Sequence, residues 1–323
     1  MGGSLFPGAR LMLSAGTVPT AGFRQRVEAA QKAGFDAISL FPQQYLRARK
    51  AEKLSPADMR DILAEHAICV DEVDPLLDWF GEDASAAETL LFDIAAELGA
   101  RSVNAPAAFA PELDPVQIGA ALARLCRRAR SFGLRIDLEF LPWTVVPDLE
   151  TALQVAAHCD SPNLGITLDF WHFYRGGGSD RTLLDLSEHQ VERITNLQLC
   201  DAPARPRKLN LRNRLAQAAV VLGQVSDGIR VNGAARFFKV SSAMKSDHPD
   251  AQALMLEASS DRCLPGEGDM PLVEWLQVLA GRGARPTLGM EIFSVDLARK
   301  PADLVARQAM GAYRRVADSA LRA

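Results

Sequence analysis

The sequence predicts a single α/β domain of 323 residues that folds as a (β/α)8 TIM barrel. Eight short Leu-rich or β-branched runs begin near residues 10, 36, 68, 101, 134, 163, 195 and 286, and helical patterns lie between them. Strands that alternate with helices form parallel βαβ units, and eight such units close into a barrel of about 250 residues. Hydrophobic residues make up 48% of the chain, which is enough for a core of this size.

The helices between these runs have clear start and stop signals. One begins after Ser55, a capping residue that is followed by proline, and a second closes on Gly99. A third runs from the capping residue Asp114 to the terminating Gly133. One helix after each strand is the alternation of a closed barrel, whose active site lies at the carboxyl ends of the strands.

Four of the predicted strands carry one oxygen-bearing side chain on the same face and near the same end. Side chains alternate faces along a strand, so the polar positions of LRIDLEF, LGITLDF, TNLQLCD and TLGMEIF share one face. The last polar positions are Glu139, Asp169, Gln198 and Glu291. In a barrel these strand ends meet at one mouth, so we expect the four side chains to converge there.

Three carboxylates and one amide oxygen form a hard ligand set. Such donors favour Mg²⁺ or Mn²⁺ over zinc, so we predict that Glu139, Asp169, Gln198 and Glu291 bind one divalent metal. A cation in this position could polarise a substrate carbonyl and stabilise an enolate, with Glu139 or Glu291 as the base. The alternative for a single buried carboxylate is an ion pair, such as Glu139 with Arg135.

Three further residues are candidates for the site. His172 follows the Asp169 strand and has an intrinsic pKa suited to proton transfer, so we predict that it is catalytic. Arg175 could bind substrate by gripping a pair of carboxylate or phosphate oxygens. Glu267, in the loop PGEGDMPL, could line the mouth and contact substrate.

The third predicted strand, CVDEVDPLLDW, is also acidic. It contains Asp71, Glu72 and Asp74 within four positions. One of these residues could reach the pocket. Acidic residues more often cap secondary structure or lie at the charged surface, and we expect these roles here.

The seventh unit contains an insertion. The candidate ligands are spaced 30, 29 and 93 positions apart, so the segment after Gln198 is about 60 residues longer than its neighbours. We assign the extra residues to positions 203–262, which begin basic, continue through an apolar stretch and end polar. A segment that leaves the carboxyl end of a strand lies over the mouth, so it is predicted to form a lid or an oligomer contact, with a passive surface insertion as the alternative.

Charge and composition exclude several classes of protein. The net charge of -4, with acids and bases interspersed, gives no field that attracts a nucleic acid or an anionic membrane. The sequence has no 18-residue apolar run and no basic leader, so neither a membrane span nor a signal peptide is predicted. Five scattered cysteines without a CxxC pattern indicate reduced thiols. We therefore expect a cytoplasmic protein with a small-molecule substrate, either monomeric or a homo-oligomer.

Several motifs together resemble the xylose isomerase-like TIM barrel superfamily of sugar isomerases, epimerases and dehydratases. They are EFLPW, LDFWHFYRGGGS, LQLCDAP, PGEGDMPL and MEIFS, and the resemblance covers most of the chain outside residues 203–262. It implies a divalent metal held at four strand ends by Glu, Asp, a His or Gln, and Glu. These positions fall on Glu139, Asp169, Gln198 and Glu291, and the family's histidine corresponds to His172. Gln in the third position is similar to the 3-dehydroshikimate dehydratases, whereas many sugar epimerases carry His there.

The resemblance implies a metal-dependent lyase or an isomerase/epimerase of carbohydrate metabolism. Its substrate would be a small polyhydroxylated carbonyl compound, such as a sugar, a keto-polyol or a cyclic polyol acid, and the reaction would pass through an enolate. Two alternatives stay open: a C-glycoside deglycosidase-like subunit that requires a small partner protein, and a catalytically inactive barrel that acts as a binding protein. A zinc nuclease on the same barrel is disfavoured, because that class uses many histidines and this chain has five.

Overall fold

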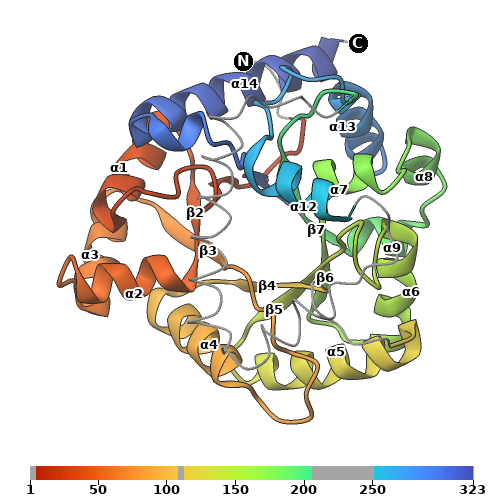
Figure 1. The fold of residues 1–323 in the computed structure, drawn as a ribbon, viewed down its shortest axis with the longest axis horizontal. Coiled ribbons are helices and arrows are strands. Elements are labelled where there is room, and N and C mark those ends of the chain that lie inside the picture. The colour runs from red at the N-terminus through yellow and green to blue at the C-terminus, as the bar shows by residue number, and fades with distance from the viewer. Residues whose placement is uncertain (1–4, 108–112, 206–250, 323) are drawn as a thin grey trace.

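Eight parallel strands form a closed barrel in sequence order, which confirms the predicted fold (Figure 1). The structure is a computed structural model that describes residues 5–107, 113–205 and 251–322. Each strand begins within one residue of its predicted start. The strands are β1 (Leu11–Leu13), β2 (Ala37–Leu40), β3 (Cys69–Val73), β4 (Ser102–Pro106), β5 (Arg135–Glu139), β6 (Leu164–Asp169), β7 (Ile194–Leu199) and β8 (Thr287–Met290).

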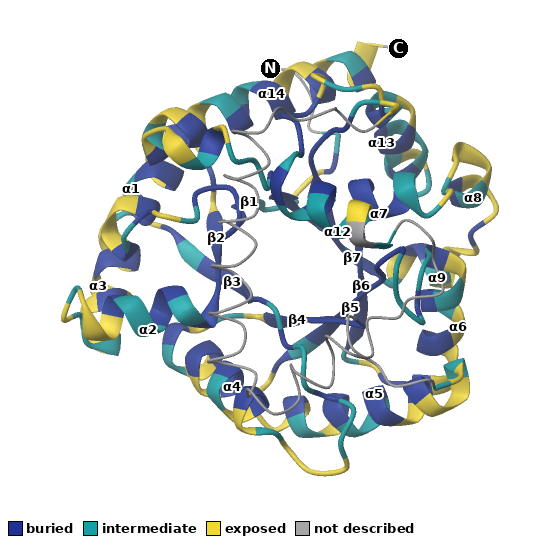
Figure 2. Cartoon of the chain, in the orientation of Figure 1, coloured by how far each residue is buried: buried dark blue, intermediate teal, exposed yellow. Residues whose placement is uncertain are grey.

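Helices form an outer ring around the barrel, with their buried faces toward the strands and their exposed faces outward (Figure 2). The longer helices are α1 (Phe23–Ala33), α2 (Pro42–Lys50), α3 (Pro56–Glu65), α4 (Ala86–Leu98), α5 (Pro115–Arg130), α6 (Leu149–Cys159), α12 (Ala251–Ser260), α13 (Leu272–Gly281) and α14 (Ala302–Arg322). The shorter ones are α7 (Phe170–Arg175), α8 (Asp180–Leu184), α9 (Glu188–Glu192) and the 3-10 turn η1 (Leu297–Arg299).

The helix boundaries follow local signals in the sequence. Asp114 caps α5, because its carboxylate accepts a hydrogen bond from the backbone N–H of Gln117 at 2.8 Å. Ser55 caps α3 in the same way. Gly99 ends α4 in the left-handed conformation, at φ 70°, where a residue without a Cβ is favoured. These short-range interactions explain why the helix starts could be predicted.

The two faces of β5 separate an apolar outer layer from a polar interior. On β5, Ile136 and Leu138 are fully buried in the hydrophobic core. The alternate residue Asp137 accepts hydrogen bonds from Arg135 at 2.7 and 2.9 Å. The structure thus pairs Arg135 with Asp137 and not with Glu139, so the alternative ion pair considered for Glu139 is wrong.

The lower interior of the barrel is tightly packed around Asp137. Its carboxylate also accepts a hydrogen bond from the Thr195 hydroxyl at 2.6 Å. A Cβ on Gly165 would lie 1.9 Å from Thr195 Oγ1 and 2.3 Å from Asp137 Oδ1. Glycine is therefore required at this position of β6, and the polar layer below the mouth is closed.

The last part of the predicted insertion, residues 251–262, packs on the barrel. Residues 206–250 lie outside the described ranges, so their role as a lid or an oligomer contact stays a prediction. The chain re-enters as α12, which contacts α7. It then forms antiparallel bridges between Cys263 and Asp201, after β7, and between Asp261 and Ser294, after β8. The last residues of the insertion are consequently part of the barrel mouth.

Across the described ranges, no helix combines the length and the apolar character that a bilayer span requires.

Candidate active site

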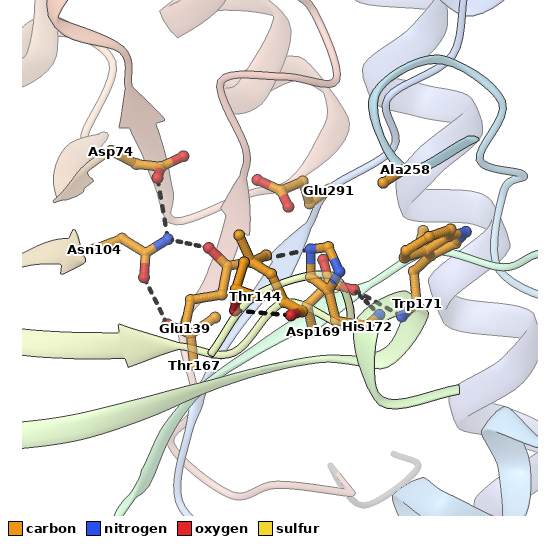
Figure 3. Close-up of polar contacts among 12 residues, drawn as sticks. Asp74, Asn104, Glu139, Thr144, Thr167, Asp169, Trp171, His172, Ala258 and Glu291 are labelled. Carbon is orange, nitrogen blue, oxygen red and sulfur yellow. Dashed lines mark hydrogen bonds and ion pairs between the residues drawn. The ribbon is translucent and has the colours of Figure 1, made fainter. Parts of the chain in front are cut away.

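The four predicted ligands lie together at the carboxyl ends of consecutive strands, and Figure 3 shows three of them, Glu139, Asp169 and Glu291. Glu139 and Asp169 are the last residues of β5 and β6, Gln198 is the penultimate residue of β7, and Glu291 directly follows β8. All four side chains belong to buried residues. The alternation of faces along each strand, together with the closure of the barrel, brings them to one mouth.

Gln198 occupies the centre of this group. One terminal atom of its amide lies 3.2 Å from Asp169 Oδ2, 3.2 Å from Glu291 Oε2 and 3.1 Å from Glu139 Oε1. A nitrogen in this place has two hydrogens and would face three acceptors, so it could not satisfy all of them. An oxygen in this place would face three carboxylate oxygens, an arrangement that a bound cation would stabilise.

The separations agree with metal coordination. Oxygens at adjacent corners of an octahedron are about 3.0 Å apart when each lies about 2.1 Å from the ion. The terminal atom of the Gln198 amide has close to this spacing, 3.1–3.2 Å, from each of the three carboxylate oxygens. An ionisable cluster in the same mouth, formed by Glu139, Asp169 and His172, offers ligand atoms that all lie within 4.8 Å of one another. The residues present can therefore hold a divalent cation.

Asp169 also explains the position of His172. Its Oδ1 accepts hydrogen bonds from the backbone N–H groups of Trp171 at 2.7 Å and His172 at 3.0 Å, so this ligand is the N-cap of α7. The first turn of α7 then directs the imidazole into the mouth. Its Nε2 lies 3.5 Å from Glu139 Oε1. The predicted acid/base residue and a predicted ligand are thus neighbours.

His172 is buried, and aromatic rings contact its imidazole. The indole rings of Trp143 and Trp171 lie edge-on to the imidazole, with ring centroids at 5.4 and 5.2 Å. Burial lowers the pKa of His172 to about 3, and the nearby Arg262 acts in the same direction. His172 is therefore neutral at pH 7. Its Nδ1 is buried and has no hydrogen-bond partner among the described residues.

Arg262 is a site residue that the sequence analysis missed. Its Nη1 lies 2.5 Å from Asp169 Oδ2 and 3.3 Å from Glu291 Oε2, and its Nη2 lies 3.4 Å from His172 Nε2. Because an arginine nitrogen can only donate, His172 Nε2 is the acceptor in this contact. The sequence analysis places Arg262 at the end of the insertion, and no local sequence pattern predicts that it is buried.

When ionised, the three carboxylates of the predicted ligand set and the Arg262 guanidinium sum to -2, and the neutral His172 adds no charge. A divalent cation would balance this set. Burial raises the pKa of Glu139 well above its usual value, and neighbouring carboxylates add to the effect. Burial also raises the pKa of Glu291, although Arg262 opposes this. Asp169 differs, because Arg262 and its backbone donors outweigh burial and hold its pKa below the usual value.

The closed barrel agrees with the family that the sequence matches. Residues 27–316 match the family described as xylose isomerase-like TIM barrel. The chain belongs to this family. Its membership confirms the resemblance drawn from the strand-end motifs.

Two curated relatives of this xylose isomerase-like barrel are 3-dehydroshikimate dehydratases. The one from Pseudomonas aeruginosa is 30% identical over 198 residues, which cover 58% of this chain and 29% of the relative. The one from Pseudomonas putida is 24% identical over 289 residues, which cover 86% of this chain and 36% of the relative. The chain thus spans about a third of the length of the curated relatives it matches.

Among solved structures, the IOLI protein with a binding zinc atom is similar to the xylose isomerase-like barrel. The two share 17% identity with a TM-score of 0.70, and the match covers 96% of this chain and 98% of that one. At this identity, the likeness shows the fold alone.

Two predicted substrate contacts lie apart from the ligands of the xylose isomerase-like barrel. Arg175 donates through Nη2 to the Pro203 carbonyl at 2.8 Å and pairs with Glu257, while Nη1 donates to the Ala204 carbonyl at 3.4 Å. Its guanidinium thus binds both ends of the insertion. Glu267 is exposed in a turn whose neighbour Gly266 approaches α14. A substrate contact for either residue stays a prediction.

The acids of the third strand are buried, so the expectation of capping and surface roles is wrong. Asp71 pairs with Arg10 at 2.7 Å. Glu72 accepts a hydrogen bond from Asn196 at 2.8 Å inside the xylose isomerase-like barrel, and burial raises its pKa well above the usual value. Asp74, directly after β3, lies at the mouth beside the ligand Glu139 (Figure 3), and burial raises its pKa to about 6.

Proposed function

We propose that this chain is a divalent-metal-dependent lyase that removes water from a small polyhydroxylated carbonyl compound, in the manner of a 3-dehydroshikimate dehydratase. The observation that carries the proposal is the meeting of three carboxylate oxygens around the Gln198 amide. The names of the two curated relatives support the substrate class. Because the chain spans about a third of their length, the activity is a proposal and not an inherited property.

The metal set that we propose is Glu139, Asp169, Gln198 and Glu291, and oxygen ligands of this kind favour Mg²⁺ or Mn²⁺. A divalent cation held there would polarise a substrate carbonyl and stabilise the negative charge that develops when the adjacent carbon loses a proton.

The protein's own groups would perform the proton transfers. Dehydration breaks one C–H bond and one C–O bond, so it needs a base for the proton and an acid for the departing hydroxyl. His172 is neutral, and because its Nε2 accepts from Arg262, the ring proton is on Nδ1, which has no described partner and can donate a hydrogen bond to the departing hydroxyl. Glu139 and Glu291 both lie beside the Gln198 amide, and we assign the base to one of them. The proton that this carboxylate takes from carbon can then pass to the departing hydroxyl, which leaves as water.

A buried arginine and two aromatic rings lie next to the proposed metal ligands. Arg262 lies between Asp169 and Glu291 and also stacks over the rings of Trp171 and Phe293, at 5.7 and 5.0 Å from their centroids. The rings of Trp171 and Phe293 would limit the access of water, and electrostatic interactions are stronger where water is excluded.

Metal analysis combined with an exchange assay tests the proposal. Purified protein would be analysed for bound metal, then incubated in ²H₂O with 3-dehydroshikimate and a panel of keto-polyols. We expect one divalent ion per chain, solvent exchange at the carbon next to the carbonyl, and loss of one water by mass spectrometry. Exchange without water loss would identify an epimerase or isomerase instead.

Matched variants make this experiment specific. Glu291→Gln should abolish exchange, whereas Glu88→Gln should not, because Glu88 is equally buried but pairs with Arg128 outside the mouth. A metal-loaded wild-type protein that exchanges no compound of the panel would refute the proposed enzyme and favour the binding-protein alternative. Activity that appears only with an added partner protein would favour the C-glycoside deglycosidase-like alternative.

A further inference from the structure

A hydrogen-bond network crosses four consecutive strands behind Glu139 (Figure 3). Its centre is Asn104 on β4, which is fully buried. Asn104 Nδ2 donates to Glu139 Oε2 at 2.7 Å and to Asp74 Oδ1 at 3.0 Å. Asn104 Oδ1 accepts a hydrogen bond from the hydroxyl of Thr167, on β6, at 3.1 Å. Residues at the ends of β3 and β5 and inside β4 and β6 are thereby joined.

The partners of Asn104 fix the orientation of its amide. Its two amide hydrogens point at two carboxylates, and its oxygen accepts from a hydroxyl. The opposite orientation would place the amide oxygen against the carboxylates of Asp74 and Glu139, which are acceptors when ionised. A buried amide with partners on three sides has one position, and it imposes that position on the carboxylates that it contacts.

The two oxygens of Glu139 consequently have different surroundings. Oε2 is held by Asn104 at 2.7 Å. Oε1 lies 3.1 Å from the terminal atom of Gln198 and 3.5 Å from His172 Nε2, so it faces the centre of the mouth. While the first contact lasts, the carboxylate cannot rotate to present both oxygens to the same point.

We propose that Asn104, held in turn by Asp74 and Thr167, is a positioning residue that makes Glu139 offer a single oxygen to the metal. This inference rests on the proposed metal-dependent function, and it places a residue on β4 behind a proposed ligand set that comes from β5 to β8. Residues that orient metal ligands in this way typically change metal affinity by about 10–100-fold when they are removed.

Calorimetric titration of the metal-free protein with Mn²⁺ tests the inference. Asn104→Ala removes the donor to Glu139 and should weaken Mn²⁺ binding by about 10–100-fold. Thr167→Val removes only the hydrogen bond that holds Asn104, so a smaller loss of several-fold is expected. Asn196→Ala is the matched control. Asn196 is also buried in the barrel interior, but its amide donates to Glu72, one layer below the mouth, so Mn²⁺ affinity should not change.

Each result bears on a separate claim. Unchanged Mn²⁺ affinity in a folded Asn104→Ala protein would overturn the positioning role, as would an equal loss in Asn196→Ala, since the effect would then be general destabilisation. If Asn104→Ala does not fold, unchanged affinity in Thr167→Val would overturn it. A wild-type protein that binds no divalent cation would instead refute the proposed function.

Discussion

Replacing Arg262 by methionine should destabilise the metal-free protein strongly. The side chain is 2% exposed, and its guanidinium is the counter-ion of Asp169 and Glu291. Removing one partner of a buried ion pair costs about 3–5 kcal/mol. With an unfolding entropy of about 2.1 cal/mol/K per residue, the 323-residue chain has a total of about 0.7 kcal/mol/K, so Tm should fall by about 4–7 °C.

A divalent cation should reverse much of this loss, because it supplies the positive charge that the two carboxylates lack in Arg262→Met. The assay is differential scanning calorimetry of the chelator-treated protein with and without saturating Mn²⁺. We expect the variant to gain more in Tm from Mn²⁺ than the wild type does. An equal deficit in both conditions would show that the cation does not share the carboxylates of Arg262, and the site described above would be wrong.

Arg26→Met is the control for this experiment. Arg26 is fully buried as well, but its guanidinium donates to the backbone carbonyls of Ala15 at 3.2 Å and Val18 at 3.0 Å rather than to a predicted ligand. Its removal should lower Tm by the same amount with and without Mn²⁺. The comparison separates the loss of a buried guanidinium from the loss of the counter-ion to the metal site.

Three further substitutions test other parts of the site. Glu291→Gln should keep the fold but lower Mn²⁺ affinity by more than the loss of about 10–100-fold that is typical when a residue that only orients a ligand is replaced. Calorimetric titration measures this affinity, and full affinity would reject the assignment of Glu291 as a ligand. His172→Asn should lower kcat by on the order of 10²-fold while metal content stays unchanged. Because burial lowers the pKa of His172 to about 3 from 6.5, the unfolded chain binds an extra proton between these values. The metal-free wild type should therefore lose about 1.4 kcal/mol per pH unit relative to this variant as the pH falls, and parallel stability curves from denaturant unfolding would contradict the buried neutral imidazole. Arg175→Met leaves the buried Glu257 without its cation, so hydrogen exchange in α12 should rise with Mn²⁺ affinity unchanged; unaltered exchange would show that the contact does not stabilise α12.

The barrel and four of its site residues could be predicted because their signals are local. Alternation along a strand placed Glu139, Asp169, Gln198 and Glu291 on one face, and the closure of eight strands then had to bring them together. The same rule applies to β3, where Glu72 and Asp74 have equal parity. Alternation along β3 predicts that Glu72 and Asp74 point to the same face of the strand. The sequence analysis nevertheless favours surface roles for both.

Arg262 and Asn104 could not be predicted in this way. Arg262 reaches the mouth because the chain pairs Asp261 with Ser294 and Cys263 with Asp201, and both pairings join segments distant in sequence. Asn104 lies in the short run SVNAP with no second polar residue at its strand end. Its importance comes from three partners on three other strands, which only the closed barrel brings into contact.

The contacts of Arg175 have a consequence for the evolution of the chain. Because one guanidinium binds the carbonyls of Pro203 and Ala204 and the carboxylate of Glu257, the two stems of the insertion are fastened to each other and to α7 at a single point. Whatever length of chain joins these stems, the barrel beneath receives the same two ends. We therefore expect that a change in the length of the segment between the stems would leave the positions of the β-strands unaltered.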